Sequence, residues 1–192
     1  MTTFTTKDAN LMNWEEFSQI TDDLISKINT YFEDKEKINV ITPLLRTGGI
    51  IGGILSIKMK VFTMLPVQFK YSYNPKAVNQ VISIPDILIN ISQPMNILLC
   101  EGNTSTGALA MKAVTSIKEK YPEAKIYLAT LTKIHDGPKR LEGIEEIFYG
   151  RLTDEKLTAT EEERVKYNLL TGITIFPWEN ADEEIADSNV AA

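Results

Sequence analysis

Short apolar runs that alternate with helical patterns constrain this fold more than any other feature of the sequence. Three such runs end next to small or polar residues, as buried strands do. The expected strands are residues 38–45, 97–100 and 125–132, and the accompanying helical patterns lie at 14–31, 50–59 and 107–120. This alternation predicts an α/β fold, with a mostly parallel sheet, right-handed crossovers and helices on its faces.

The chain of 192 residues fits one domain, which we place at residues 13–179. Residues 1–12 are expected to form a flexible lead-in, residues 71–94 a long mobile loop and residues 180–192 an acidic, disordered tail. Additional strands are expected at 61–70, 144–150 and 173–176, a further helix at 161–169, and capping boxes at Asn13 with Glu16 and Thr160 with Glu163.

The composition excludes several classes of protein. With Cys100 and His135 as the only residues of their types, neither an intrachain disulfide nor a Cys-rich or multi-histidine metal site can form. The net charge of −6 argues against a nucleic-acid partner, because phosphate contacts need a basic surface. The sequence shows no signal peptide and no apolar run of membrane-spanning length, so we expect a cytoplasmic protein without a membrane partner.

Two glycine-containing turns follow expected strands, at residues 46–49 and 101–107. Ligands of parallel α/β folds bind at the carboxyl ends of the strands, and free N–H groups at a helix start bind anions. The second turn lacks the Lys-Ser/Thr pair of a P-loop, and the first lacks the Rossmann glycine spacing. Each turn therefore indicates an anion site, although a capped helix start without a ligand would leave the same pattern.

Four segments together resemble the type I phosphoribosyltransferases, and within them the purine enzymes. Residues 13–17 (Asn-Trp-Glu-Glu-Phe) resemble their first helix, and residues 45–49 (Leu-Arg-Thr-Gly-Gly) their pyrophosphate loop. Residues 97–107 (Ile-Leu-Leu-Cys-Glu-Gly-Asn-Thr-Ser-Thr-Gly) resemble their signature, and residues 175–179 (Ile-Phe-Pro-Trp-Glu) their last strand. The resemblance implies a sheet with a small hood region and transfer of the phosphoribosyl group of phosphoribosyl pyrophosphate to a purine base. It also implies Mg²⁺ as cofactor and a homodimer.

The resemblance assigns a role to each matching position. Glu101 would hold the ribose hydroxyls or contact the metal, and Glu101, Ser105 and Tyr73 would form the catalytic set. The other implied contacts are the 5′-phosphate (Thr104, Ser105, Thr106, Gly107, Ala108, Leu109), the pyrophosphate (Arg46, Thr47, Gly48, Gly49), the closing loop (Ser72, Tyr73) and the base (Lys133, Ile173).

Several positions depart from the family pattern. The usual acidic pair is Glu101-Gly102 here, Ser105 replaces an acid, Leu109 replaces a hydroxyl residue and Ile173 replaces an aromatic ring. Residues 154–170 resemble an insertion. Two main functions therefore stay open: a phosphoribosyltransferase of purine salvage, or a non-catalytic module that binds phosphoribosyl pyrophosphate or a nucleotide. A third alternative is a plain interaction domain with a decayed site, but the retention of both turns argues against it. The long 71–94 segment favours the enzyme, whereas Gly102 and Leu109 favour the binding module.

Overall fold

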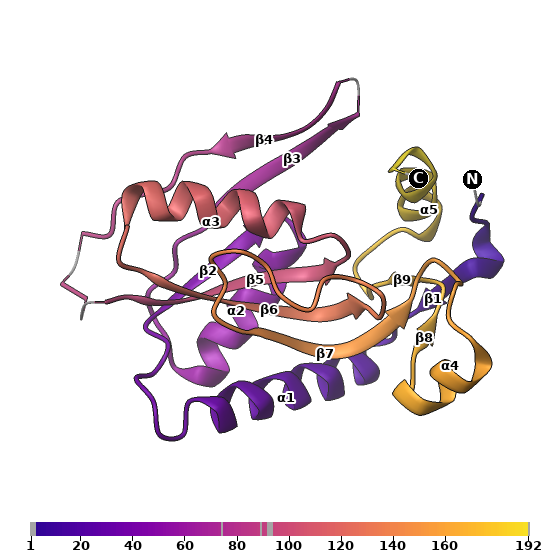
Figure 1. The fold of residues 1–192 in the computed structure, drawn as a ribbon, viewed down its shortest axis with the longest axis horizontal. Coiled ribbons are helices and arrows are strands. Elements are labelled where there is room, and N and C mark those ends of the chain that lie inside the picture. Colours follow the sequence, from indigo (N-terminus) through magenta and orange to yellow (C-terminus); the bar gives the residue numbers. More distant parts are fainter. Residues whose placement is uncertain (1–2, 74, 89, 92–93, 192) are drawn as a thin grey trace.

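The computed structural model describes residues 3–191 except 74, 89 and 92–93. A seven-stranded sheet forms its centre, in the order β4-β3-β2-β5-β6-β7-β8 (Figure 1). The strands are β2 (Val40–Leu45), β3 (Val67–Tyr73), β4 (Lys76–Ile82), β5 (Asn96–Thr104), β6 (Lys125–Ile134), β7 (Ile147–Asp154) and β8 (Leu170–Thr171). Every neighbouring pair is parallel except β3 and β4, so the predicted mostly parallel α/β sheet is confirmed.

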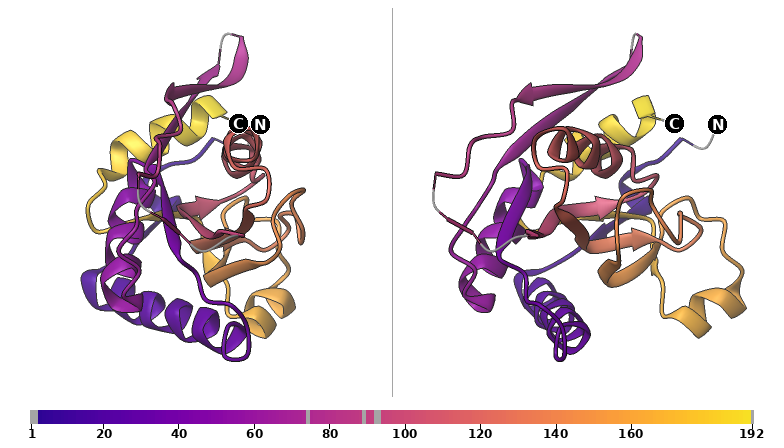
Figure 2. Two further views of the ribbon diagram at one scale, coloured as in Figure 1. Left: turned by 90° about the vertical axis from the view of Figure 1, so that its left-hand side faces the viewer. Right: turned by 60° about the vertical axis from the view of Figure 1, so that its left-hand side comes forward.

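Helices cover both faces of the sheet, because its central strands are apolar on both sides. Leu98 and Cys100 of β5 pack with α1 (Trp14–Tyr31) and α2 (Thr47–Met59). Ile97 and Leu99, which alternate with them, pack with α3 (Ala108–Lys120) on the opposite face. Figure 2 shows the sheet between these two layers. Among the described residues, no helix is long and apolar enough to span a membrane.

Helix α1 begins and ends where the sequence pattern predicts. Asn13 accepts hydrogen bonds from the N–H groups of Glu15 and Glu16, and the Glu16 carboxylate accepts one from the Asn13 N–H. This capping box satisfies N–H groups that a helix start otherwise leaves free. Phe17 and Ile20 begin the buried stripe that faces the sheet.

A second, smaller layer at one end of the sheet joins the two ends of the chain (Figures 1 and 2). Strand β1 (Ala9–Leu11) pairs in parallel with β9 (Ile173–Ile175), and helix α5 (Ala181–Ala191) packs on this pair. Ile185 of α5 is buried against Ile173 and Ile175. The Asn189 side chain also exchanges two hydrogen bonds with the backbone of Phe4, at 2.8 and 3.0 Å. We call β1, β9, α5 and the segment between β9 and α5 the hood.

The hood corrects two predictions about the chain ends. The described part of the lead-in, residues 3–12, is not loose, because it contains a short 3-10 helix (Thr6–Asp8) and β1. The acidic tail is not disordered, because most of it forms α5. Asn180 caps this helix by accepting from the N–H groups of Asp182 and Glu183. The acidic first turn also interacts favourably with the helix dipole.

Other boundaries also differ from the prediction. Helix α2 begins at Thr47, so most of the expected turn at 46–49 is its first turn. Strand β5 continues to Thr104, which shortens the expected turn at 101–107. Of the predicted strand 61–70, only residues from Val67 onward belong to β3. The antiparallel pair β3 and β4 occupies 67–82, so the first part of the expected 71–94 loop is a hairpin.

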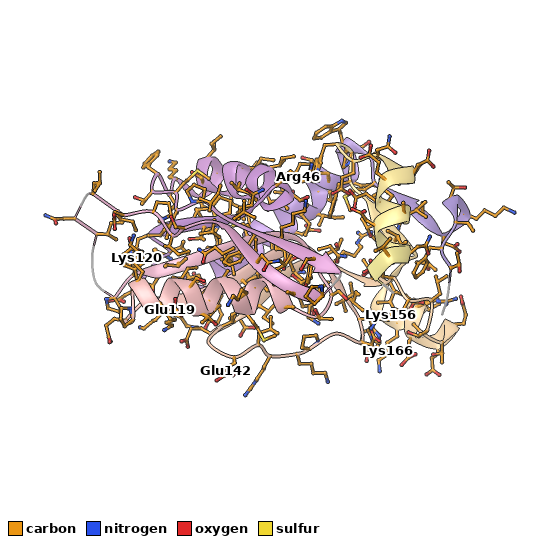
Figure 3. The ribbon with its side chains drawn as sticks, turned by 90° about the horizontal axis from the view of Figure 1, so that it is seen from above. Arg46, Glu119, Lys120, Glu142, Lys156 and Lys166 are labelled. Atoms are coloured by element: carbon orange, nitrogen blue, oxygen red, sulfur yellow. The ribbon has the colours of Figure 1, made fainter. Side chains whose placement is uncertain are left out.

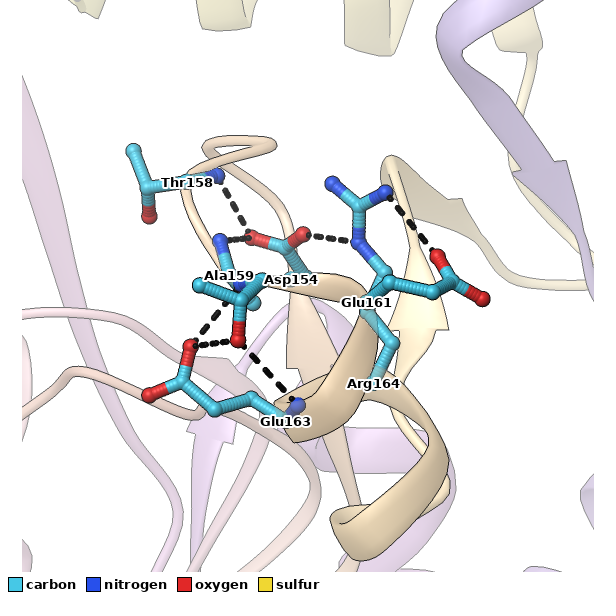
Figure 4. A network of polar contacts seen from close by, with 7 residues as sticks. Asp154, Thr158, Ala159, Glu161, Glu163 and Arg164 are labelled. Atoms are coloured by element: carbon cyan, nitrogen blue, oxygen red, sulfur yellow. Dashed lines mark hydrogen bonds and ion pairs between the residues drawn. The ribbon is translucent and has the colours of Figure 1, made fainter.

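Asp154 organises the segment after β7, which leads to helix α4 (Glu161–Tyr167) (Figure 4). The Asp154 carboxylate accepts from the N–H groups of Thr158 and Ala159 and from Arg164 Nε, at 2.8, 3.1 and 3.0 Å. Burial opposes ionisation of this carboxyl group, but the three bonds outweigh burial and hold its pKa below the ordinary value. Thr160 and Glu163 form the predicted capping box of α4.

Candidate functional site

A cavity of about 300 Å³ opens at the carboxyl ends of β2 and β5, where the fold class places ligands. Its wall comes from the start of α2, from β5, from the first turn of α3, from the segment after β7 and from the hood. Of the predicted site residues it includes Arg46, Thr47, Gly48, Glu101, Leu109 and Ile173. The two predicted turns and the hood therefore meet around one space.

Glu101 is the most deeply placed carboxylate of this wall, with 9% of the residue exposed. Burial raises its pKa to about 7, although a hydrogen bond from Thr104 Oγ1, at 2.6 Å, favours the charged form. Thr104 was predicted to bind phosphate, but in the structure its hydroxyl donates to Glu101. A carboxylate at this position can accept hydrogen bonds from hydroxyl groups of a bound sugar.

The start of α3 lies beside the cavity. Gly107, its N-cap residue, has φ of +75°, which glycine adopts without the strain of a side chain. A Cβ added there would also lie 2.6 Å from the side chain of Leu141. Thr106 Oγ1 lies 3.4 Å from the Ala108 nitrogen, and Leu109 reaches the cavity wall. The first-turn N–H groups of α3 therefore begin beside the cavity, where they can donate to a phosphate.

The start of α2 forms the neighbouring part of the wall. The peptide bond between Leu45 and Arg46 is cis, and the Arg46 side chain is exposed. Thr47 Oγ1 lies 3.4 Å from a carboxylate oxygen of Glu179, to which it donates. Gly48 packs so closely on β5 that an added Cβ would lie 2.2 Å from the Cys100 carbonyl oxygen. This contact holds the first turn of α2 against the end of β5.

Gly102 explains why the acidic pair of the family is incomplete here. A Cβ at this position would lie 2.4 Å from Thr47 Cγ2 and 3.2 Å from the ring of Phe176. A carboxylate at position 102 would displace these two cavity residues. The absence of a second acid at position 102 therefore goes together with the close packing of α2, β5 and the hood around Gly102.

The hood adds carboxylates that the sequence analysis did not select. Glu179, Glu184 and Asp187 all line the cavity, and Arg46 lies beside α5 (Figure 3). Burial raises the pKa of the Glu179 carboxyl group, and the charge of Glu184 raises it further. The hydrogen bonds that Glu179 accepts from the Phe176 N–H and from Thr47 lower this pKa and oppose the shift. Burial and Asp187 raise the pKa of Glu184, whereas Arg46 lowers it. Among the described residues, Arg46 is the only cationic side chain of this wall.

Other predicted residues lie away from the described cavity wall. Lys133 is buried, and its amine donates to the carbonyl groups of Ile134 and Gly137 at 3.3 and 3.4 Å. Burial lowers the pKa of this amine, and Asp136 opposes the shift.

Ser72 lies in the hairpin, where its hydroxyl donates to the Pro75 carbonyl at 2.9 Å. Tyr73 belongs to β3, but its side chain lies outside the part of the chain that the structure describes, so its predicted role stays a prediction. The predicted residues Gly49, Thr104, Ser105, Thr106, Gly107 and Ala108 flank the wall without lining it.

The cavity is also lined by residues that were not predicted from the sequence: Phe69, Asn103, Glu155 and Thr174. A signal was present for α5, because Asn180 followed by acidic residues is a helix-start pattern. The segment around Glu155 carried no comparable signal, since its position depends on how β7 pairs with β6 and β8.

The donor set fits a magnesium ion that arrives with a phosphorylated ligand. Mg²⁺ is usually held by one or two carboxylates together with substrate phosphates and water. Glu101 lines the cavity from β5, and Glu179 and Glu184 line it from the hood. The described residues contain no ready cluster of three or more metal-binding side chains. Phosphate oxygens of a ligand would therefore supply the rest of the coordination shell.

No family model matches this chain, and no curated protein matches its sequence. Solved structures match its fold. A purine phosphoribosyltransferase from Pyrococcus horikoshii Ot3 superposes with a TM-score of 0.65 at 17% identity, over 90% of this chain and 95% of that one. A xanthine-guanine-hypoxanthine phosphoribosyltransferase from Helicobacter pylori gives a TM-score of 0.61 at 13% identity, over 93% and 99% of the two chains.

A third similar structure is a hypothetical protein from Neisseria gonorrhoeae with bound ppGpp. Its TM-score is 0.66 at 15% identity, over 94% of this chain and 97% of that one. These neighbours show that the chain has the type I phosphoribosyltransferase fold of the purine enzymes, which confirms the predicted fold and resemblance.

Proposed function

We propose that this protein transfers the phosphoribosyl group of phosphoribosyl pyrophosphate to a ring nitrogen of a purine base. The meeting of two helix starts and Glu101 around one cavity carries this proposal. The substrate has two separate anionic groups joined by a sugar with free hydroxyls. Two sets of backbone N–H groups with a carboxylate between them match that arrangement. Fold neighbours that are purine phosphoribosyltransferases support the choice of reaction.

Each part of the wall then has a role in the transfer. The start of α3 binds the 5′-phosphate, the start of α2 with Arg46 binds the pyrophosphate, and Glu101 accepts hydrogen bonds from the ribose hydroxyls. The bond between ribose C1′ and the pyrophosphate oxygen breaks, and its electron pair leaves with pyrophosphate. The lone pair of a base nitrogen forms the new bond to C1′, and the N–H proton of the base passes to solvent.

Catalysis of this kind depends on position and charge. The sugar becomes positively charged as pyrophosphate leaves, and nearby carboxylates such as Glu101 stabilise that charge. Mg²⁺ bound to pyrophosphate would neutralise charge on the leaving group. The wall residues hold the two reactants close together, which replaces a bimolecular encounter by an oriented one. No histidine or cysteine nucleophile is needed for these steps.

A second candidate function is binding of a phosphorylated purine nucleotide without turnover. The neighbour with bound ppGpp favours it, since that protein has the same fold. Gly102 and Leu109 also favour it, because each leaves out a polar group that the family pattern places near the ribose or the phosphate. The two functions use the same cavity and differ in whether pyrophosphate is released.

Pyrophosphate release separates the two functions. The protein is incubated with phosphoribosyl pyrophosphate and Mg²⁺ and with each of a panel of purine and pyrimidine bases. We expect release that requires a purine. Absence of release with every base, in protein that binds ppGpp by calorimetry, would exclude the transferase and support the binding module.

A further inference from the structure

The side chain of Glu155 occupies a part of the cavity wall for which the proposed reaction has no assigned role. It is the first residue after β7, and it lines the cavity together with Asn103 of β5. One of its carboxylate oxygens accepts a hydrogen bond from the side-chain amide nitrogen of Asn103, at 3.2 Å. Among the described residues this is its only hydrogen bond, so the carboxylate retains capacity to accept others.

Asn103 is itself held in one orientation. Its side-chain oxygen accepts a hydrogen bond from the Thr132 hydroxyl at 3.1 Å, and the two residues face each other in the register of β5 and β6. Because a carboxylate can only accept, the amide nitrogen must point to Glu155. Two central strands therefore fix the position of a carboxylate that belongs to a loop.

Glu155 also lies next to the apolar part of the wall. The Asp154 carbonyl accepts a hydrogen bond from the Gly172 N–H at 3.1 Å. Glu155 and Ile173 directly follow these two bonded residues, and both line the cavity. A flat heterocycle packed on Ile173 would therefore present its polar edge near Glu155.

The direction of β5 indicates that the base, and not the ribose, lies near Glu155. Asn103 lies two residues beyond Glu101 on the same side of the strand, which places it roughly 7 Å further along. A sugar held at Glu101 has its 5′-phosphate on the side of α3, so the group attached to C1′ extends toward the hood. Because the pyrophosphate on the same carbon is assigned to the start of α2 with Arg46, the base is the group left to meet Glu155.

We propose that Glu155 accepts hydrogen bonds from N–H groups on the edge of the purine base and thereby selects guanine over xanthine. This inference rests on the proposed function. Guanine offers a ring N–H and an adjacent amino group to a carboxylate, whereas xanthine has a carbonyl oxygen in place of the amino group. Asn103 is a positioning residue, because it acts on the base through Glu155.

The test compares Glu155→Gln with Glu162→Gln, an exposed glutamate on α4. For wild-type protein we expect kcat/KM to be higher for guanine than for xanthine. Glu155→Gln should lower kcat/KM for guanine at least tenfold, reduce the guanine-to-xanthine ratio, and leave KM for phosphoribosyl pyrophosphate within twofold. Glu162→Gln should change none of these values. A wild-type preference for xanthine, or an equal loss for both bases, would overturn the proposal.

Asn103→Ala provides a second route that leaves the carboxylate in place. It should lose the same selectivity as Glu155→Gln, and the double variant should lose no more than either single variant. Additive losses would show that Asn103 acts independently of Glu155.

Binding measurements keep the inference testable if the wild-type protein releases no pyrophosphate. In that case the proposed transfer fails, and calorimetry compares guanosine monophosphate with ribose 5-phosphate. Glu155→Gln should weaken binding of the nucleotide at least tenfold and leave ribose 5-phosphate unchanged. Equal effects on both ligands, or no binding of either by the wild-type protein, would overturn the role of Glu155.

Discussion

The two ends of the cavity are built in different ways. One end, where we propose that the phosphates bind and which we call the phosphate end, comes from two short stretches of the core, residues 45–49 and 101–109, each of which joins a strand to the next helix. The other end, where we propose that the base binds and which we call the base end, collects side chains from the segment after β7, from β9 and from α5. The first end is therefore specified by local sequence, and the second by contacts between distant parts of the chain.

Breaking the phosphate end at Gly107 should have the largest effect. A valine at this position needs φ of +75° and would meet Leu141, so the first turn of α3 must move. We expect Gly107→Val to lose measurable binding of ribose 5-phosphate. Calorimetry tests this, and a cooperative thermal transition shows that the variant is folded. Retained affinity in a folded variant would place the phosphate elsewhere.

The raised pKa of Glu101 should make the stability of the folded protein depend on pH. Its pKa rises from an ordinary value of 4.5 to about 7 in the folded protein, so the folded state binds the proton more tightly. Stability therefore falls as pH rises from about 4.5 to about 7. The neutral variant Glu101→Gln should escape this fall and exceed wild-type stability at pH 8 by about 3 kcal/mol. Urea denaturation in EDTA at pH 5 and pH 8 measures the difference; equal pH profiles would contradict it.

Gly102 tests the packing that connects the two ends of the cavity. Gly102→Ala places a Cβ against Thr47 and Phe176, which should reduce the free energy of unfolding by about 2 kcal/mol. The matched control is Gly53→Ala, because a Cβ at Gly53 meets nothing within 4 Å. Denaturant titration of both variants checks this. Equal stability of the two would mean that the contact at Gly102 relaxes freely.

The smallest effect is expected from a substitution at Asn189, which holds the hood at the base end of the cavity. Asn189→Ala removes two hydrogen bonds to Phe4 and should cost about 1 kcal/mol of stability. Loosening the hood should raise KM for the base more than KM for phosphoribosyl pyrophosphate, which is held mainly by the starts of α2 and α3. Val190→Ala, at an exposed neighbouring position, is the control. A matching rise in both KM values would show that the hood supports the whole cavity.

The sequence predicted the core well because its signals are local. Helix α1 agrees with its capping box and apolar stripe, and the strands around Leu98 and Leu128 agree with their apolar runs. The two strand ends and helix starts at the phosphate end could be located for the same reason, since a strand, a small turn and a helix start lie next to one another in the chain.

The base end could not be predicted in the same way. Glu155 belongs to it through the pairing of β7 with its neighbours, and Glu184 through the packing of Ile185 on β9. Net charge also misled the prediction for residues 180–192, because acidic residues stabilise the first turn of a helix as readily as they keep a chain unfolded. Whether such a segment folds as a helix depends on single apolar residues such as Ile185, which packs on β9. One apolar residue gives no periodic pattern from which a helix could be predicted.

The bonds between Phe4 and Asn189 also set a limit on when the hood can form during synthesis. These residues are 185 positions apart, and β1 must wait for β9 before it can pair. The core strands can assemble while later residues are still being translated, because domains fold as their segments emerge. The base end of the cavity can close only after residue 189 has left the ribosome. A nascent chain paused before α5 would thus carry a formed phosphate end without the base end that completes the site.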